Sequence, residues 1–218
     1  MRLAVPLAVL ALAFSASALA RNPDIKTPKG TYKLDPHHAS LTVKLLHLGL
    51  SNYTMQFLRF DATVVLDPAK PENSSVIASV DPTSIETNYA GDYKATHKDS
   101  PYASFDEAVS RGPKFLNSGT FSTIGFKSTS VKAGKDGHLL VTGDLTFLGQ
   151  THPVTLDTVV VGSVDKHPHL QKGVIGFSAT TRFNRSEWGM VGTQAFLGDE
   201  ISLTFEGEFQ QTDGAAAR

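Results

Sequence analysis

The clearest structural signal in the chain is the segment LLVTGDLTFLGQTHPVTLDTVV at residues 139–160. Apolar side chains fall at every second position in both halves, and a Gly149-Gln150 turn signal lies between the halves. The alternating apolar residues are Leu139, Val141, Leu145, Phe147, Val154 and Leu156. A period of two is typical of strands with one buried and one wet face. The segment therefore predicts two neighbouring antiparallel strands.

The same alternation recurs along most of the chain. Further strands are expected at residues 31–34, 39–47, 58–66, 76–80, 124–129, 175–183 and 201–209. An antiparallel sheet of this length hides its edges most simply by closing on itself. The predicted fold is all-β: one extended antiparallel eight-stranded barrel, whose interior has room for side chains and one small ligand.

Residues 88–117 interrupt this pattern. Ser100-Pro101 opens a stretch in which apolar residues are spaced by three and four, and Gly112-Pro113 ends it. We expect one short amphipathic helix here, near a mouth of the barrel.

Residues 1–20 differ from the rest of the chain. Arg2 precedes an apolar run that ends with Ala18-Leu19-Ala20, the layout of a secretory signal peptide cleaved after Ala20. The alternative, a membrane anchor, needs about 20 apolar residues, and Pro6 and Ser15 interrupt a run that is already short. We therefore predict an exported, soluble protein in which residues 21–218 form a single domain, without stable membrane insertion after cleavage.

Composition excludes several kinds of site. The chain has 20 Lys+Arg, 21 Asp+Glu, a formal charge of −1 and no Cys. The absence of cysteine removes disulfides, thiol nucleophiles and thiolate metal sites. Near-neutral charge argues against a nucleic-acid partner, which normally requires a basic surface.

No catalytic motif stands out. The sequence lacks G-x-S-x-G, H-E-x-x-H and a Gly-rich phosphate loop. His37, His38 and His47 are the best metal candidates, but His47 is nine residues past His38, about 30 Å along an extended strand. We predict no metal site and no enzyme activity. A hydrolase that uses His38 or His47 remains an alternative.

The predicted inner wall is apolar, with small residues such as Ala62 and Gly143 interleaved. Its members are Leu41, Val43, Leu45, Phe60, Val64, Leu145, Phe147, Phe177 and Phe183. Such a wall either encloses a void suited to a long apolar chain or packs into a filled core. A filled barrel would favour a stress-related scaffold or partner-binding module. Trp188, beside a Gly-containing loop, either contacts an apolar ligand or caps the core.

An ordered set of motifs resembles the YceI-like family over Tyr32 to Phe209. The motifs include Asp35-Pro36, His47-Leu48-Gly49, Gly143-Asp144-Leu145-Thr146, Asn184-Arg185-Ser186 and Gly198-Asp199-Glu200-Ile201. The resemblance implies a lipocalin-like barrel, periplasmic and often dimeric, that binds polyisoprenoids or isoprenoid quinones in an apolar tunnel.

That resemblance implies a carrier whose ligand is the isoprenoid lipid itself, with no separate cofactor. Arg185 and His38 are the candidate head-group contacts; Arg185 could instead tie its own loop together through carbonyl groups. The chain departs from the family pattern at Ala39, Met55 and residues 88–112. These departures leave the ligand length and the shape of the mouth open.

Overall fold

The computed structural model describes residues 22–212, so the predicted signal peptide Met1–Ala20 lies outside the described residues. The strands are β1 (Gly30–His47), β2 (Ser51–Phe57), β3 (Phe60–Leu66), β4 (Ser75–Val80), β5 (Ile85–Glu86), β6 (Ile124–Ala133), β7 (Leu139–Phe147), β8 (Gln150–Val164), β9 (Val174–Asn184) and β10 (Leu197–Gln211). The helices are α1 (Tyr93–Thr96) and α2 (Phe105–Arg111), with 3₁₀ turns η1 (Pro71–Asn73), η2 (Pro82–Ser84) and η3 (Arg185–Trp188). Between residues 22 and 212, no helix has the length and apolar character needed to cross a bilayer.

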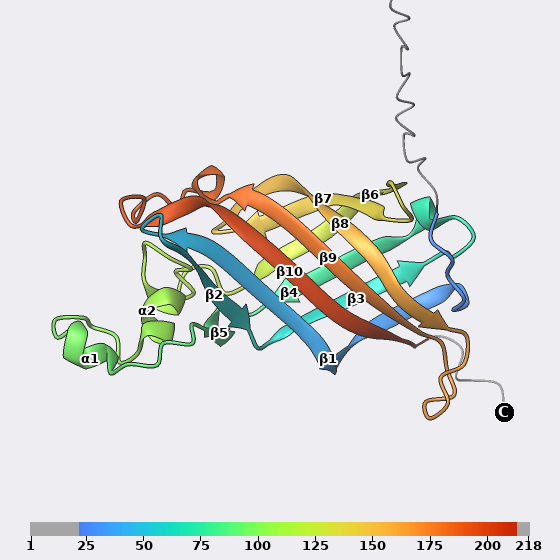
Figure 1. Ribbon diagram of the computed structural model, residues 1–218, viewed down its shortest axis with the longest axis horizontal. Helices are drawn as coiled ribbons and strands as arrows, with labels where there is room; N and C mark the ends of the chain where they lie inside the picture. The colour runs from blue at the N-terminus through green and yellow to red at the C-terminus, as the bar shows by residue number, and fades with distance from the viewer. Residues whose placement is uncertain (1–21, 213–218) are drawn as a thin grey trace, which may run out of the picture.

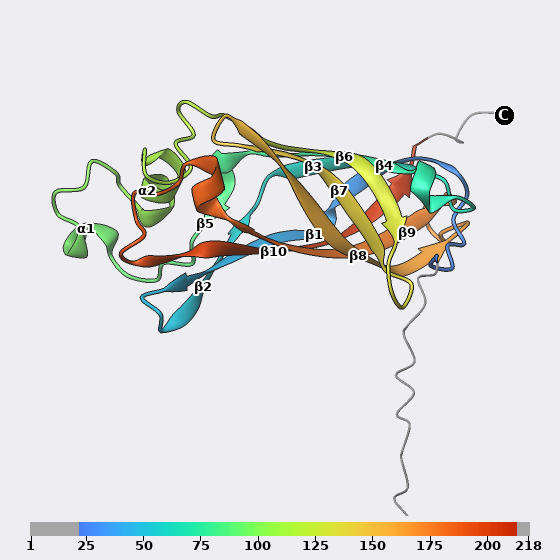
Figure 2. The same ribbon diagram turned by 90° about the horizontal axis from the view of Figure 1, so that it is seen from above.

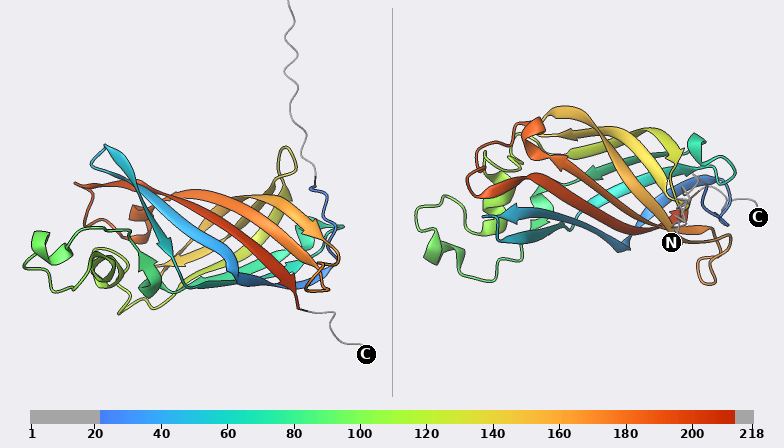
Figure 3. Two further views of the ribbon diagram at one scale, coloured as in Figure 1. Left: turned by 60° about the horizontal axis from the view of Figure 1, so that its bottom comes forward. Right: turned by 45° about the horizontal axis from the view of Figure 1, so that its top comes forward.

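Eight strands close into an antiparallel barrel. Their order is β10-β9-β8-β7-β6-β4-β3-β1, and β1 pairs in turn with β10. The strands wrap around a common axis (Figures 1 and 3). The predicted hairpin at residues 139–160 is the β7–β8 pair, with Phe147 opposite Gln150 across its turn. The predicted all-β barrel is confirmed.

One end of the barrel is built differently from the other. The start of β1 pairs with β3, whereas its end, Leu41–His47, pairs with β2, and β2 then pairs with β5. Helices α1 and α2 lie beyond this end (Figures 1 and 2). The predicted helix is α2, and Ser104 caps it by accepting a hydrogen bond from the Glu107 N–H. Strand β2 and the four-residue α1 were not predicted.

A cluster of buried side chains fills the other end of the barrel. Tyr32 and Ile175 are fully buried there, and Leu66 and Phe209 are each 2% exposed. The Tyr32 hydroxyl donates a hydrogen bond to the Pro28 carbonyl, which ties the polar lead before β1 to this end. We call it the closed end.

Strand β1 carries an irregularity between Leu34 and Ala39 that interrupts its register with β10. The Asp35 carboxylate holds this segment, because it accepts hydrogen bonds from the His37 N–H, from His38 Nδ1 at 2.9 Å and from Gln210 Nε2 at 2.7 Å. The bond to His38 is the main cause that lowers the pKa of Asp35, and the same bond raises the pKa of His38.

The His38 side chain is 63% exposed. It borders a groove on the outer surface beside Glu206 and Glu208 and lines neither interior cavity. His38 therefore lies outside the two interior cavities, and its contact with a ligand head group stays a prediction. His38 precedes the inward Ala39, so its outward direction agrees with the alternation of residues 39–47.

Gly143 allows close packing between β6 and β7. A Cβ at this position would lie 2.5 Å from Phe126 Cζ and 2.6 Å from the Lys127 carbonyl oxygen. We expect Gly143→Ala to lower the free energy of unfolding by about 1–3 kcal/mol in urea denaturation, because the backbone oxygen cannot move away freely. The control is Gly162→Ala on β8, where a Cβ meets nothing within 4 Å. Equal effects of the two substitutions would contradict this account.

The Asp35–His38 pair predicts a titration effect. We expect Asp35→Asn to lower the pKa of His38 toward its usual value, as followed by NMR of the imidazole protons. In the wild type, the stability from His38 is fully present below the unfolded-state pKa and is lost as pH rises through the raised folded-state value. The stability from Asp35 is present above its unfolded-state pKa and is lost as pH falls through the lowered folded-state value. As a control, Asp61→Asn on the outer face of β3 should leave the pKa of His38 unchanged.

Candidate functional site

The barrel interior holds two adjoining cavities. A narrow cavity of about 190 Å³ lies toward the closed end, and a wide cavity of about 420 Å³ lies toward α1 and α2. Six residues border both cavities: Leu41, Val80, Ile124, Leu145, Phe183 and Leu203. The core is therefore hollow, which settles the question that the alternating sequence left open and counts against the filled-barrel scaffold.

The narrow cavity is apolar. Small side chains, Ala62, Ala78 and Ala179, make space within its wall, and Phe177 and Phe209 border it near the closed end. No Lys, Arg or His lines it. Its one acidic neighbour, Asp61, is exposed on β3 and accepts a hydrogen bond from the Ala62 N–H. An anionic group in this cavity would have no cationic side chain among the described wall residues to offset its desolvation.

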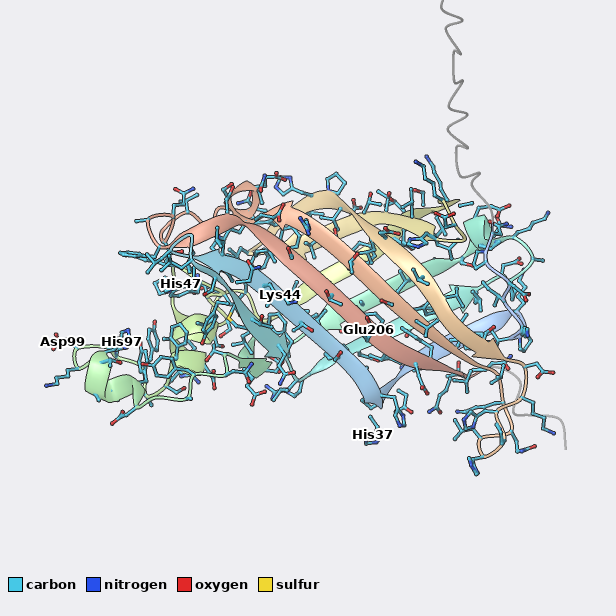
Figure 4. The ribbon with its side chains drawn as sticks, viewed as in Figure 1. His37, Lys44, His47, His97, Asp99 and Glu206 are labelled. Atoms are coloured by element: carbon cyan, nitrogen blue, oxygen red, sulfur yellow. The ribbon has the colours of Figure 1, made fainter. Side chains whose placement is uncertain are left out.

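The wall of the wide cavity includes segments outside the eight barrel strands. Strands β1, β2 and β5 and helix α2 contribute apolar side chains, while His47, Tyr89, His97 and Arg185 add polar groups. His47 and His97 are exposed, and Figure 4 places both at the α1 end of the molecule. This end is the mouth of the barrel.

The structure places nine of the predicted wall residues on the cavities. Leu41, Leu145 and Phe183 border both; Val43, Leu45 and Phe147 border the wide one; Phe60, Val64 and Phe177 border the narrow one. They come together because each occupies an inward position on its strand. Their contact with a ligand remains a prediction.

Trp188 borders neither cavity. It is 1% exposed, and its indole N–H donates to the Leu145 carbonyl oxygen at 3.2 Å. Its ring packs edge-on against Phe183 and His152, with centroids 4.9 and 5.0 Å away. Trp188 therefore caps the core behind the cavity wall, which is one of the two positions that the sequence left open for it.

Arg185 is a buried cation at the wide cavity, with 1% exposure. Its guanidinium donates to the carbonyls of Gly198, Met190 and Leu197 and to Thr193 Oγ1. Burial lowers the pKa of Arg185, and the nearby Asp199 carboxylate partly opposes that shift. The hydrogen bonds join η3 to the start of β10, as expected if Arg185 ties its own loop together.

The histidines do not form a common site. Figure 4 shows His37 and His47 far apart along β1. Among residues 22–212, no three or more His, Asp or Glu side chains are grouped as metal ligands would be. His47 borders the wide cavity, yet its side chain makes no hydrogen bond to an acid or a hydroxyl among those residues. Of the two histidines in the hydrolase alternative, His38 contacts Asp35 on the outer surface and His47 borders the wide cavity.

Sequence reasoning missed part of the wide cavity. The missed wall residues include Tyr53, Met55, Phe57, Ile85 and Leu116. Three of these alternate along β2, so a period-two signal was present at residues 53–57. Ile85 lies on a two-residue strand and Leu116 in a loop, where no periodic signal exists.

Solved structures share this architecture. The crystal structure of BcnA from Burkholderia cenocepacia superposes with a TM-score of 0.64 at 19% identity, covering 80% of this chain and 98% of BcnA. A structure described as a polyisoprenoid binding domain from Saccharophagus degradans gives a TM-score of 0.53 at 10% identity, covering 83% of this chain and 98% of that domain. At these identities the similarity establishes the fold alone.

Sequence comparison goes further. A UPF0312 protein of Vibrio cholerae is 32% identical over 168 residues, which cover 76% of this chain and 80% of that protein. Protein YceI of Escherichia coli O6:H1 is 36% identical over 137 residues, covering 62% of this chain and 63% of that protein. The YceI-like domain family matches residues 32–209, nearly the whole described barrel. The chain therefore belongs to the YceI-like family.

Proposed function

We propose that this protein is a periplasmic carrier that sequesters a polyisoprenoid lipid or isoprenoid quinone in the barrel, without a covalent step. The observation that carries the proposal is the pair of adjoining apolar cavities along the barrel axis. Such an interior suits a long hydrocarbon chain and offers few groups for bond breaking. The similarity to a domain described as polyisoprenoid binding supports this ligand class.

Desolvation of the chain supplies the binding energy. Burial of about 400 Å² of apolar ligand surface contributes about 10 kcal/mol at 25 cal/mol per Å². The entropy lost on association opposes it by about 4 kcal/mol or more. The remainder is sufficient for useful affinity without a strong polar contact. Discrimination between ligands then depends on the length of the cavities and on a few polar groups.

Export agrees with this role. The basic start, apolar run and Ala18-Leu19-Ala20 ending of residues 1–20 support delivery to the periplasm. A carrier there would shield a water-insoluble chain between membranes. A homodimer, implied by the family resemblance, remains a prediction that size-exclusion chromatography with light scattering can test.

The direct test uses protein purified from its native host. Extraction of the mature protein with organic solvent, followed by mass spectrometry, should yield a prenyl compound in near-equimolar amount. A matched extract of protein unfolded before purification controls for carry-over. Extracts that contain no prenyl lipid, together with no binding of added prenols, would overturn the proposed function.

Ala78 provides a test of whether the ligand occupies the narrow cavity. It borders that cavity from β4, so Ala78→Leu should occupy space that the bound ligand needs. We expect affinity for the prenols solanesol and farnesol to fall about tenfold each, as an overpacking cost of about 1–3 kcal/mol implies. Competition with a fluorescent lipid measures both.

The matched control is Ile77→Leu. Ile77 is the neighbouring residue on β4 and is 58% exposed on the outer face. The Ile77→Leu variant should bind both prenols with the affinity of the wild type. Unchanged affinity for solanesol in Ala78→Leu would show that the ligand does not occupy the narrow cavity.

A further inference from the structure

One polar group in the narrow cavity has no partner. Thr158 Oγ1 is the single buried side-chain oxygen or nitrogen within residues 22–212 that makes no hydrogen bond. Thr158 lies on β8, is 7% exposed and borders the narrow cavity. A buried hydroxyl without a partner costs about 1–3 kcal/mol, so an orphan at this position calls for an explanation.

Its neighbour Thr181 supplies an internal comparison. Thr181 borders the same cavity and is 9% exposed, but its hydroxyl donates to the Thr155 carbonyl oxygen at 2.8 Å. The barrel wall can therefore satisfy an inward threonine from its own backbone. The wall supplies no such backbone partner to the Thr158 hydroxyl. Valine at this position would fill nearly the same volume without leaving a hydroxyl unpaired.

The surroundings of Thr158 limit what could pair with it. Its strand partners Leu139 and Ala179 also border the cavity and carry no polar side-chain atoms. Because no Lys, Arg or His lines this cavity, an anionic phosphate or carboxylate would be buried there without a counter-charge. A neutral alcohol or carbonyl needs only one hydrogen bond.

The side chain can present its hydroxyl to the cavity. Oγ1 is now enclosed by the wall, but a rotation of about 120° about the Cα–Cβ bond moves the hydroxyl to the position now held by the methyl group or by the Cβ hydrogen. A ligand oxygen in the narrow cavity would favour the rotamer that pairs with it.

We propose that Thr158 is a specificity-determining contact that hydrogen-bonds a neutral oxygen function of the ligand. The ligand class is a long apolar lipid whose alcohol or carbonyl end is lodged in the narrow cavity, with its chain extending toward the mouth. This inference rests on the proposed carrier function and adds the orientation of the ligand and the charge state of its polar end.

The test compares probes that differ only at one end: geranylgeraniol, the hydrocarbon with hydrogen in place of its hydroxyl, and geranylgeranyl phosphate. Binding to the full mature protein is measured by competition with a fluorescent lipid. Thr158→Val should lower the affinity for geranylgeraniol about three- to tenfold, because it removes one net hydrogen bond. The affinity for the hydrocarbon should not change. Thr158→Ser should keep the preference for the alcohol. The phosphate should bind the wild type more weakly than the alcohol.

Thr181→Val is the matched control, because it removes an inward hydroxyl that already has a partner. It should not alter the ratio of alcohol to hydrocarbon affinity. Circular dichroism and thermal melting verify that each variant folds. Thr158→Val that retains wild-type preference for the alcohol would overturn the inference and leave the carrier function standing. Wild-type protein that binds none of the three probes would overturn both.

Discussion

The pairing of β1 with β10 is the constraint on which the rest of the molecule depends. It joins the first and last strands of the described chain, so the sheet has no open edge along the barrel. Closure also defines an inside, because each strand must then direct alternate side chains toward one axis. Without that pairing, the inward residues of β7 and β9 would line an exposed sheet face in place of a cavity.

Hollowness follows from how the closed wall is filled. Alanines at 62, 78 and 179 provide too little volume to meet across the axis, whereas Phe177 and Phe209 fill the closed end. At the mouth, β2, β5 and α2 add wall where β1 leaves β3, which widens the interior. The cavity at the mouth is thus larger than the one toward the closed end, about 420 against about 190 Å³.

Among residues 22–212, few charged side chains border the cavities: Arg185 borders the wide one and the exposed Asp61 the narrow one. The Arg185 guanidinium is satisfied by backbone carbonyls of its own loop, so its burial organises the junction of η3 and β10. The Asp35–His38 pair is likewise kept apart from the apolar interior. It lies at the irregular part of β1, outside both cavities. Under the proposed function, such an interior binds its ligand by desolvation, and the hydroxyl of Thr158 is the inferred contact for selectivity.

Sequence alone was sufficient for much of this architecture. Period-two alternation located most strands of the barrel and nine inward wall residues, because the pleat itself produces that pattern. Motif order identified the family. Local pattern did not reveal the irregularity of β1 between Leu34 and Ala39, which is seen only against β10, and it left the capping position of Trp188 open, because that position depends on β7. It also could not distinguish a hollow barrel from a filled one. That difference is set by whether side chains from strands distant in sequence meet across the axis, which only the tertiary structure determines.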